Sequence, residues 1–218
     1  MSRLYAENHR ALQDQFDTRR IADRVEQLAM KTELDEQAAG FIGSRDMFFL
    51  STINATGQPT VSYKGGEQGF VRVLDANTIV FPSYDGNGMF LSMGNIALTS
   101  LVGLLFIDFE TPFRMRVQGS ATVSATDPLL KTYKDAELLV RVNVTETWIN
   151  CPRYIHTFKK ATQSRYAPTA ACETPMAEWK RVDLLQADLP AKDVGQAEKA
   201  GGTITIEQWF QNVAEGKG

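Results

Sequence analysis

Short strand-like segments recur between residues 47 and 123, and their spacing constrains the fold more than any other feature of the sequence. Each segment is rich in aromatic and β-branched residues and is followed by turn residues. A βαβ sheet would need a longer helix between its strands, whereas only one brief helical stretch, residues 89–98, interrupts this series. The spacing therefore predicts a mainly β fold with some helix, built as a β-barrel. The expected strands are residues 47–53, 60–64, 70–74, 78–83, 102–109 and 113–123.

Three strand segments carry more specific predictions. Residues 102–109 are almost continuously apolar, which indicates a strand buried on both faces. Gly119 falls inside a long strand and indicates a bend or a bulge. Residues 138–148 alternate in polarity, with valines at every second position from Val140 to Val144. This alternation predicts a half-buried strand at the edge or rim of the sheet.

Helices are expected at both ends of the barrel. In residues 1–42, Ile21, Val25 and Leu28 share one helix face behind a cap at Asp17 or Thr18, and we expect that face to pack on a core. The predicted parts of the chain are a helical segment packed on the barrel (1–42), the barrel domain (43–166) and a C-terminal extension (167–218).

Two later helix starts have recognisable signals. Asp127 as N-cap and Pro128 at the first helical position predict a helix to about Lys134. Thr205-Ile206-Glu207-Gln208 is a capping-box pattern and predicts a final helix.

The charged and ligand-forming residues exclude several classes of protein. A net charge of −3 argues against a general nucleic-acid binder, because such proteins need a basic face. Two histidines and two cysteines are too few for multi-histidine zinc sites or Fe–S clusters, so no metal is expected. If the protein is an enzyme, its chemistry is expected to come from something other than its own side chains. No secretory signal or membrane-length apolar stretch is visible, so we expect a cytoplasmic location, with Cys151 and Cys172 as thiols.

A loop with two glycines, residues 83–88, follows one expected strand and precedes the brief helix. Its glycines let backbone N–H groups approach an anion, and the helix N-terminus adds partial positive charge. Ser83 and Asn87 can add side-chain hydrogen bonds. An ordinary strand-to-helix turn is the alternative interpretation.

Two strands carry basic residues that are suited to an anion. Ser62 and Lys64 share one strand face and Tyr63 takes the other, although a solvated lysine at a strand end is the alternative. Arg114 and Arg116 share a face of a later strand, where they either hold an anion or block edge-to-edge pairing.

Several motifs follow one another in an order that carries more information than any one of them. They are Arg45–Thr52, Gly57–Pro59 with the strand ending at Lys64, Phe81–Met89, Gly94–Ile96, Val102–Phe106, Arg116–Gly119, Asn150–Ile155 and Arg10–Arg20. Together they resemble the FMN-binding split-barrel family related to pyridoxamine 5′-phosphate oxidase, in its branch of predicted flavin-nucleotide-binding proteins. The resemblance covers about residues 10–166.

The resemblance implies a homodimer with FMN bound in two clefts at the interface. The strand that lies along the isoalloxazine ring and ribityl chain matches Val61, Ser62, Tyr63 and Lys64. The strand end and loop that hold the phosphate match Ser83, Tyr84, Asn87, Gly88 and Met89. The position matching Arg114 contributes from the neighbouring strand, and the segment 150–154 reaches the cofactor from the partner chain.

Two departures separate the chain from the oxidase itself. A basic pair follows the loop serine in the oxidase, whereas Gly88 and Met89 stand at those positions here. The phosphate charge must then be neutralised by Lys64, Arg114, Arg116 or a partner-chain residue such as Arg153. The oxidase's C-terminal arginine-containing substrate motif has no clear match after Tyr166, so we do not expect a true pyridoxamine-phosphate oxidase.

Three functions remain as hypotheses. The first is an FMN-dependent oxidoreductase acting on a small molecule, with the flavin supplying the redox chemistry. The second is a non-catalytic flavin-binding or storage module. The third is a haem-binding split-barrel protein, which the scarcity of histidine weakens.

Overall fold

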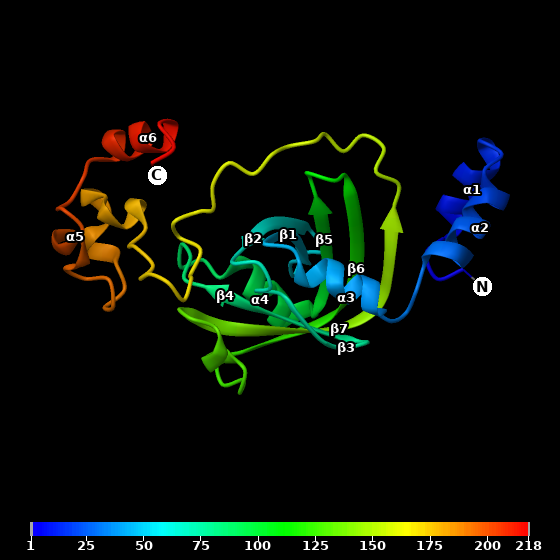
Figure 1. Cartoon of the computed structure of the whole chain (residues 1–218), viewed down its shortest axis with the longest axis horizontal. Helices are drawn as coiled ribbons and strands as arrows, with labels where there is room; N and C mark the ends of the chain where they lie inside the picture. The colour runs from blue at the N-terminus through cyan, green and yellow to red at the C-terminus, as the bar shows by residue number, and fades with distance from the viewer. Residues whose placement is uncertain (1, 218) are drawn as a thin grey trace. The chain divides into compact units, whose positions relative to one another are not determined.

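The computed structural model describes residues 2–217, and the chain divides into two compact units, Met1–Ala161 and Thr162–Gly218 (Figure 1). The first unit contains helices α1 (Glu7–Gln15), α2 (Arg19–Ala29), α3 (Glu36–Gly43) and α4 (Leu91–Thr99), the 3-10 helix η1 (Leu130–Thr132), and strands β1 (Met47–Ile53), β2 (Pro59–Gly65), β3 (Arg72–Asp75), β4 (Thr78–Tyr84), β5 (Leu101–Asp108), β6 (Phe113–Ser124) and β7 (Ala136–Asn150). The second contains the 3-10 helices η2 (Glu178–Arg181) and η3 (Asp183–Asp188) and helices α5 (Gln196–Lys199) and α6 (Ile206–Ala214).

The seven strands form one antiparallel sheet in the order β2-β1-β5-β6-β7-β4-β3. The sheet curls on itself, because Phe48 on β1 and Phe81 on β4 pack with ring centroids 5.0 Å apart although three strands lie between theirs. Phe106 on β5 joins them at 5.2 Å from Phe48. β2 and β3 are the two edges, so the barrel is open between them, and the predicted mainly β, split-barrel fold is confirmed.

Alternation along the strands separates an inner face, which lines the core, from an outer face. Two strand predictions need correction. β5 is buried on one face only, because its outer-face residue Leu101 is 53% exposed while Val102, Leu104 and Phe106 are buried. β7 is an interior strand, because it pairs with β6 on one side and β4 on the other.

The bulge predicted at Gly119 is confirmed. The register between β6 and β7 shifts at the step from Gln118 to Gly119, where β7 carries one extra residue, Thr145. A Cβ atom on Gly119 would lie 2.2 Å from the carbonyl oxygen of Asn143, so the close approach of the two backbones requires glycine there.

The helix predicted from Asp127 to Lys134 is wrong beyond its first turn. The Asp127 carboxylate does accept the backbone N–H of Leu129 at 2.9 Å, but only the single turn η1 follows. The chain leaves this turn at Tyr133, whose ring packs 3.9 Å from the Arg72 guanidinium, and then enters β7. The capping box that starts α6 is confirmed, since the Gln208 N–H donates to the Thr205 hydroxyl.

Residues 2–30 form a hairpin of α1 and α2, here called the N-terminal arm. The prediction that its apolar face packs on a core is wrong for the single chain, because Ile21, Val25 and Leu28 are 59%, 50% and 67% exposed. Thr18 precedes α2 but makes no side-chain capping bond.

The predicted limits of the three parts of the chain, 1–42, 43–166 and 167–218, stay predictions. No helix within residues 2–217 combines the length and apolar character needed to cross a membrane.

Candidate functional site

A ladder of polar side chains joins the edge strand β2 to helix α4. The Asn95 amide donates to the Thr60 hydroxyl at 3.4 Å and to the Thr52 hydroxyl at 3.0 Å. One step along β2, the Ser62 and Ser92 hydroxyls lie 3.1 Å apart. Helix and strand therefore run alongside each other, and the start of α4 points toward the end of β2 that carries Lys64.

Lys64 is the third inward-facing residue of this edge strand, after Thr60 and Ser62. Burial alone lowers the pKa of its ammonium group, because no carboxylate stands close enough to offset the lost hydration. The Lys64 side chain forms no hydrogen bond or ion pair with any residue between 2 and 217. A half-buried cation without an anion is costly for the chain alone, so its surroundings are suited to an anionic ligand.

The loop before α4 completes this end of the ladder. Ser83 is buried on β4, and Gly88 has φ +76°, which favours glycine. Asn87 accepts the Met89 N–H at 3.1 Å, while the Met89 side chain is 68% exposed. α4 follows without any side-chain cap, so its first-turn N–H groups remain available to an anion.

Tyr84 stands at the end of β4. Burial raises the pKa of its phenol to about 12, with Tyr133 as a further cause, so Tyr84 is neutral at physiological pH. Its hydroxyl can therefore act as a hydrogen-bond donor.

The remaining predicted residues of the strands lie on the outer face. Tyr63 pairs with Phe49, Phe49 with Leu105, and Leu105 with Arg116, so these four form one row across β2, β1, β5 and β6. Val61 and Tyr63 are 70% and 62% exposed. This outer row is therefore a largely apolar surface that ends in a cation.

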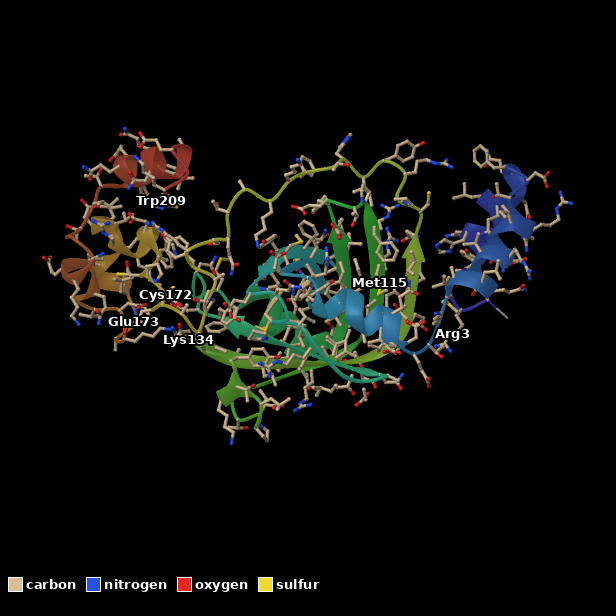
Figure 2. All side chains as sticks on the ribbon, in the orientation of Figure 1. Arg3, Met115, Lys134, Cys172, Glu173 and Trp209 are labelled. Atoms are coloured by element: carbon tan, nitrogen blue, oxygen red, sulfur yellow. The ribbon has the colours of Figure 1, made fainter. Side chains whose placement is uncertain are left out.

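Arg114 and Arg116 share the outer face of β6, as predicted, and Met115 between them is buried on the inner face (Figure 2). Arg114 pairs in register with Asn150 on β7. The Nε atom of Arg114 and the Oδ1 atom of Asn150 are both buried without a hydrogen-bond partner. Such orphaned polar atoms point to a ligand or a partner chain at this position.

The structure thus divides the predicted residues between two faces of one sheet. Ser62, Lys64 and Ser83 face inward near α4, whereas Val61, Tyr63, Arg114 and Arg116 face outward. The Arg114 strand is not next to β2, because β1 and β5 lie between them. One chain therefore does not bring Lys64 and Arg114 together.

Arg153 belongs to neither group. It is exposed in the segment after β7, which passes over the turn between β5 and β6 (yellow in Figure 1). This segment is anchored where the Phe158 N–H donates to the Phe109 carbonyl at 3.0 Å. Cys151 and Cys172 form no disulfide with each other, as predicted, and both are exposed.

Sequence reasoning missed Ser92 and Asn95 as members of these groups, and it named Asn150 within the segment 150–154 without pairing it with Arg114. Ser92 and Asn95 are three residues apart on α4, a spacing that places both on one helix face and could have identified them. Asn150 gives no such signal, because its pairing with Arg114 depends on the register after the bulge.

Two cavities within residues 2–217 are lined by residues outside these groups. One cavity of about 660 Å³ lies between α3 and the turn from β5 to β6, lined by Gln37, Phe41, Asp108, Glu110, Thr111, Pro112, Phe113 and Met115. Another of about 510 Å³ lies within the N-terminal arm. Among residues 2–217, no three His, Cys, Asp or Glu side chains gather as metal ligands do.

Comparison with known proteins identifies the family. The fold is similar to that of HupZ from Group A Streptococcus, at 16% identity over 53% of this chain and 93% of that chain, with a TM-score of 0.44. It is also similar to an FMN-binding protein from Syntrophomonas wolfei (12% identity, 64% and 97% covered, TM-score 0.39) and to an F420 reductase (16%, 54% and 98%, 0.39). None of the curated proteins matches the sequence. These structural scores are too low to carry an argument, whereas residues 34–148, more than half of the chain, match the family described as pyridoxamine 5'-phosphate oxidase. The chain therefore belongs to the pyridoxamine 5'-phosphate oxidase family.

Proposed function

We propose that this chain binds FMN and uses it as an oxidoreductase acting on a small molecule. The observation that carries the proposal is Lys64, a half-buried cation without an anion, on the strand that leads toward the uncapped start of α4. A phosphate dianion supplies what this place lacks, because it neutralises the ammonium and accepts hydrogen bonds from the first-turn N–H groups.

Other features of the chain fit the rest of the cofactor. β2 is an edge strand, so one side of its backbone offers unpaired N–H and C=O groups to the polar edge of a flavin ring. FMN, when bound, supplies the redox chemistry. The protein binds and orients it, and donors such as Lys64 stabilise negative charge that develops beside them.

We further propose that two chains form a homodimer through the outer face of the sheet. This face carries exposed apolar residues, Val61 and Leu101 among them, and the β5 sequence is apolar enough for burial on both sides. A second copy that covers this face buries the apolar row and brings its own Arg114 and Arg153 toward the first chain. The orphaned Nε atom of Arg114 supports such a role across the interface.

Titration of the purified protein with FMN tests the proposal. Oxidised flavin gives a yellow chromophore, and a ligand at one hundred times its Kd stabilises the fold by about 2.7 kcal/mol. We expect FMN to raise the Tm, and NADH or NADPH to bleach the bound flavin. An unchanged Tm with no yellow chromophore refutes flavin binding, and flavin that no nicotinamide donor bleaches indicates a storage module.

A further inference from the structure

The two helices of the N-terminal arm pack with their polar sides together. Arg10 of α1 forms an ion pair with Asp23 of α2 at 2.6 Å. The Glu26 carboxylate accepts the Arg3 N–H at 2.8 Å and the Ser2 hydroxyl at 3.0 Å. A hairpin in water ordinarily encloses its apolar side chains, so this one is built with the opposite side inward.

Five large apolar side chains of the arm are exposed instead of being enclosed between its helices. Ile21, Val25 and Leu28 form a stripe along α2, and Leu12 and the C-cap residue Phe16 form a second stripe one turn long at the end of α1. Neither helix has a buried residue, and the five side chains are between 50% and 69% exposed. They expose on the order of 500 Å² in total, which is within the range of apolar patches that serve as interaction sites.

The arm begins at the outer face of the barrel. The Arg3 guanidinium, at the foot of the arm (Figure 2), donates to the Glu146 carboxylate at 2.6 Å. Directly after the arm, where the chain returns to the barrel, the backbones of Lys31 and Thr147 exchange two hydrogen bonds of 2.8 Å. Glu146 pairs with Gln118 on the outer face of the sheet, so the arm leaves its own barrel on the face proposed for the dimer.

We propose that the exposed apolar side chains of each arm pack on the barrel of a second copy of this chain. The proposal rests on the homodimer proposed above. The barrel offers exposed apolar side chains at the end of α4 and in β2 and β5, with Leu98, Val61 and Leu101 exposed by 63%, 70% and 53%. Two arms that each cover such a surface bury on the order of 2,000 Å², which is sufficient for a stable, specific dimer.

A charge placed in the stripe tests this arrangement. Val25→Glu puts a carboxylate into two symmetric contacts, and we expect the dimer dissociation constant to rise at least a hundredfold in sedimentation equilibrium. Val25 is half exposed, so the chain still folds, and the far-ultraviolet circular dichroism spectrum checks this. Gln27→Glu is the matched control, because it adds the same charge to the same helix outside the stripe. An unchanged dissociation constant for Val25→Glu, or equal weakening by both variants, overturns the proposal.

Cross-linking identifies the surface that the arm covers. A photoreactive benzophenone side chain at position 28, in a mixture of heavy- and light-isotope chains, is expected to link the arm to barrel residues near Val61 or Leu101 of the other isotope. Links within one chain, or only between two arms, overturn the proposal. The cross-links and the FMN titration test the two proposals separately. The expected cross-links without flavin binding would refute the proposed function only. Flavin binding without these cross-links would refute the packing of the arm on a second copy only.

Discussion

The hydroxyls of Ser62 and Ser92 lie 3.1 Å apart, although thirty residues separate them in the sequence. This contact fixes the register between an edge strand and the helix that follows the glycine-containing loop. Because the next inward residue of β2 is Lys64, the same register directs the lysine toward the uncapped end of α4. The first two predictions depend on that placement.

Replacing Lys64 is expected to weaken FMN binding through the phosphate. Lys64→Gln removes the cation and keeps a hydrogen-bonding side chain, and a charge-assisted bond of this kind is worth about 1.5–3 kcal/mol, or roughly 10- to 100-fold in affinity. Riboflavin has the same ring without the phosphate and serves as the control ligand. Isothermal titration should give a large loss for FMN and little change for riboflavin, and an equal loss for both would place Lys64 at the ring instead.

The same lysine is expected to destabilise the protein when no ligand is bound. Burial lowers the pKa of Lys64 below its unfolded value of about 10.5, so the unfolded chain binds more protons between the two values. Stability from this group is therefore present above pH 10.5 and is lost as the pH falls through the folded pKa. Lys64→Met removes this dependence and is expected to raise the Tm of the ligand-free protein at pH 7.5.

Thermal unfolding between pH 7.5 and 10.5 measures this effect. Tyrosines of the unfolded chain begin to ionise near the top of this range, at about pH 10, but they are common to both proteins and cancel in the difference. The gap in Tm between Lys64→Met and the wild type should narrow as the pH rises. A constant gap would mean that the lysine is not desolvated in solution.

Arg114 is expected to act on the flavin held by the partner chain, because it lies on the other face of the sheet from Lys64. Consider a mixed dimer of one Lys64→Gln chain and one Arg114→Ala chain. If each cleft takes Lys64 from one chain and Arg114 from the other, one cleft contains both substitutions and the other contains neither. Half of the sites should then bind FMN with wild-type affinity. If Arg114 acts within its own chain, every site has one defect, and no tight fraction is observed. Unchanged affinity in the Arg114→Ala homodimer would exclude any role for Arg114.

Gly119→Ala is expected to be strongly destabilising. Its Cβ atom would meet a backbone oxygen at 2.2 Å, and relief requires separation of β6 from β7, at a cost of about 3 kcal/mol or more. Gly94→Ala is the control, because its Cβ atom meets nothing within 4 Å and alanine favours a helix interior by roughly 0.5–1 kcal/mol. Urea denaturation should show opposite signs for the two variants, and equal effects would contradict the bulge.

The sequence predicted those parts of the fold that depend on local pattern. The strands follow from residues that alternate or are continuously apolar, the bulge from Gly119, and the last helix from the pair Thr205 and Gln208. Each of these signals lies within a few residues of the feature that it predicts. The sequence did not predict that the helix after Asp127 ends after one turn, because its end is set by the return of the chain to β7 and not by the cap.

The candidate site depends on relations that a sequence does not contain. Lys64 and Arg114 both read as anion-binding residues, but only the strand order reveals that they lie on opposite faces with β1 and β5 between them. In the same way, the helical spacing of Ile21, Val25 and Leu28 predicts packing on a core, but the three side chains are exposed in the single chain. An apolar pattern along one helix does not contain the contacts that the helix makes with the rest of the fold.

The extra residue Thr145 changes the phase of β7. Even-numbered residues line the barrel up to Val144, and odd-numbered residues line it from Thr147 onward. A variant that straightens the strand while keeping Thr145 would turn Trp148 and Asn150 into the barrel interior, whereas deletion of Thr145 would leave both on the outer face beside the two arginines. The number of residues in this segment, more than their identity, decides on which face of the sheet their side chains lie.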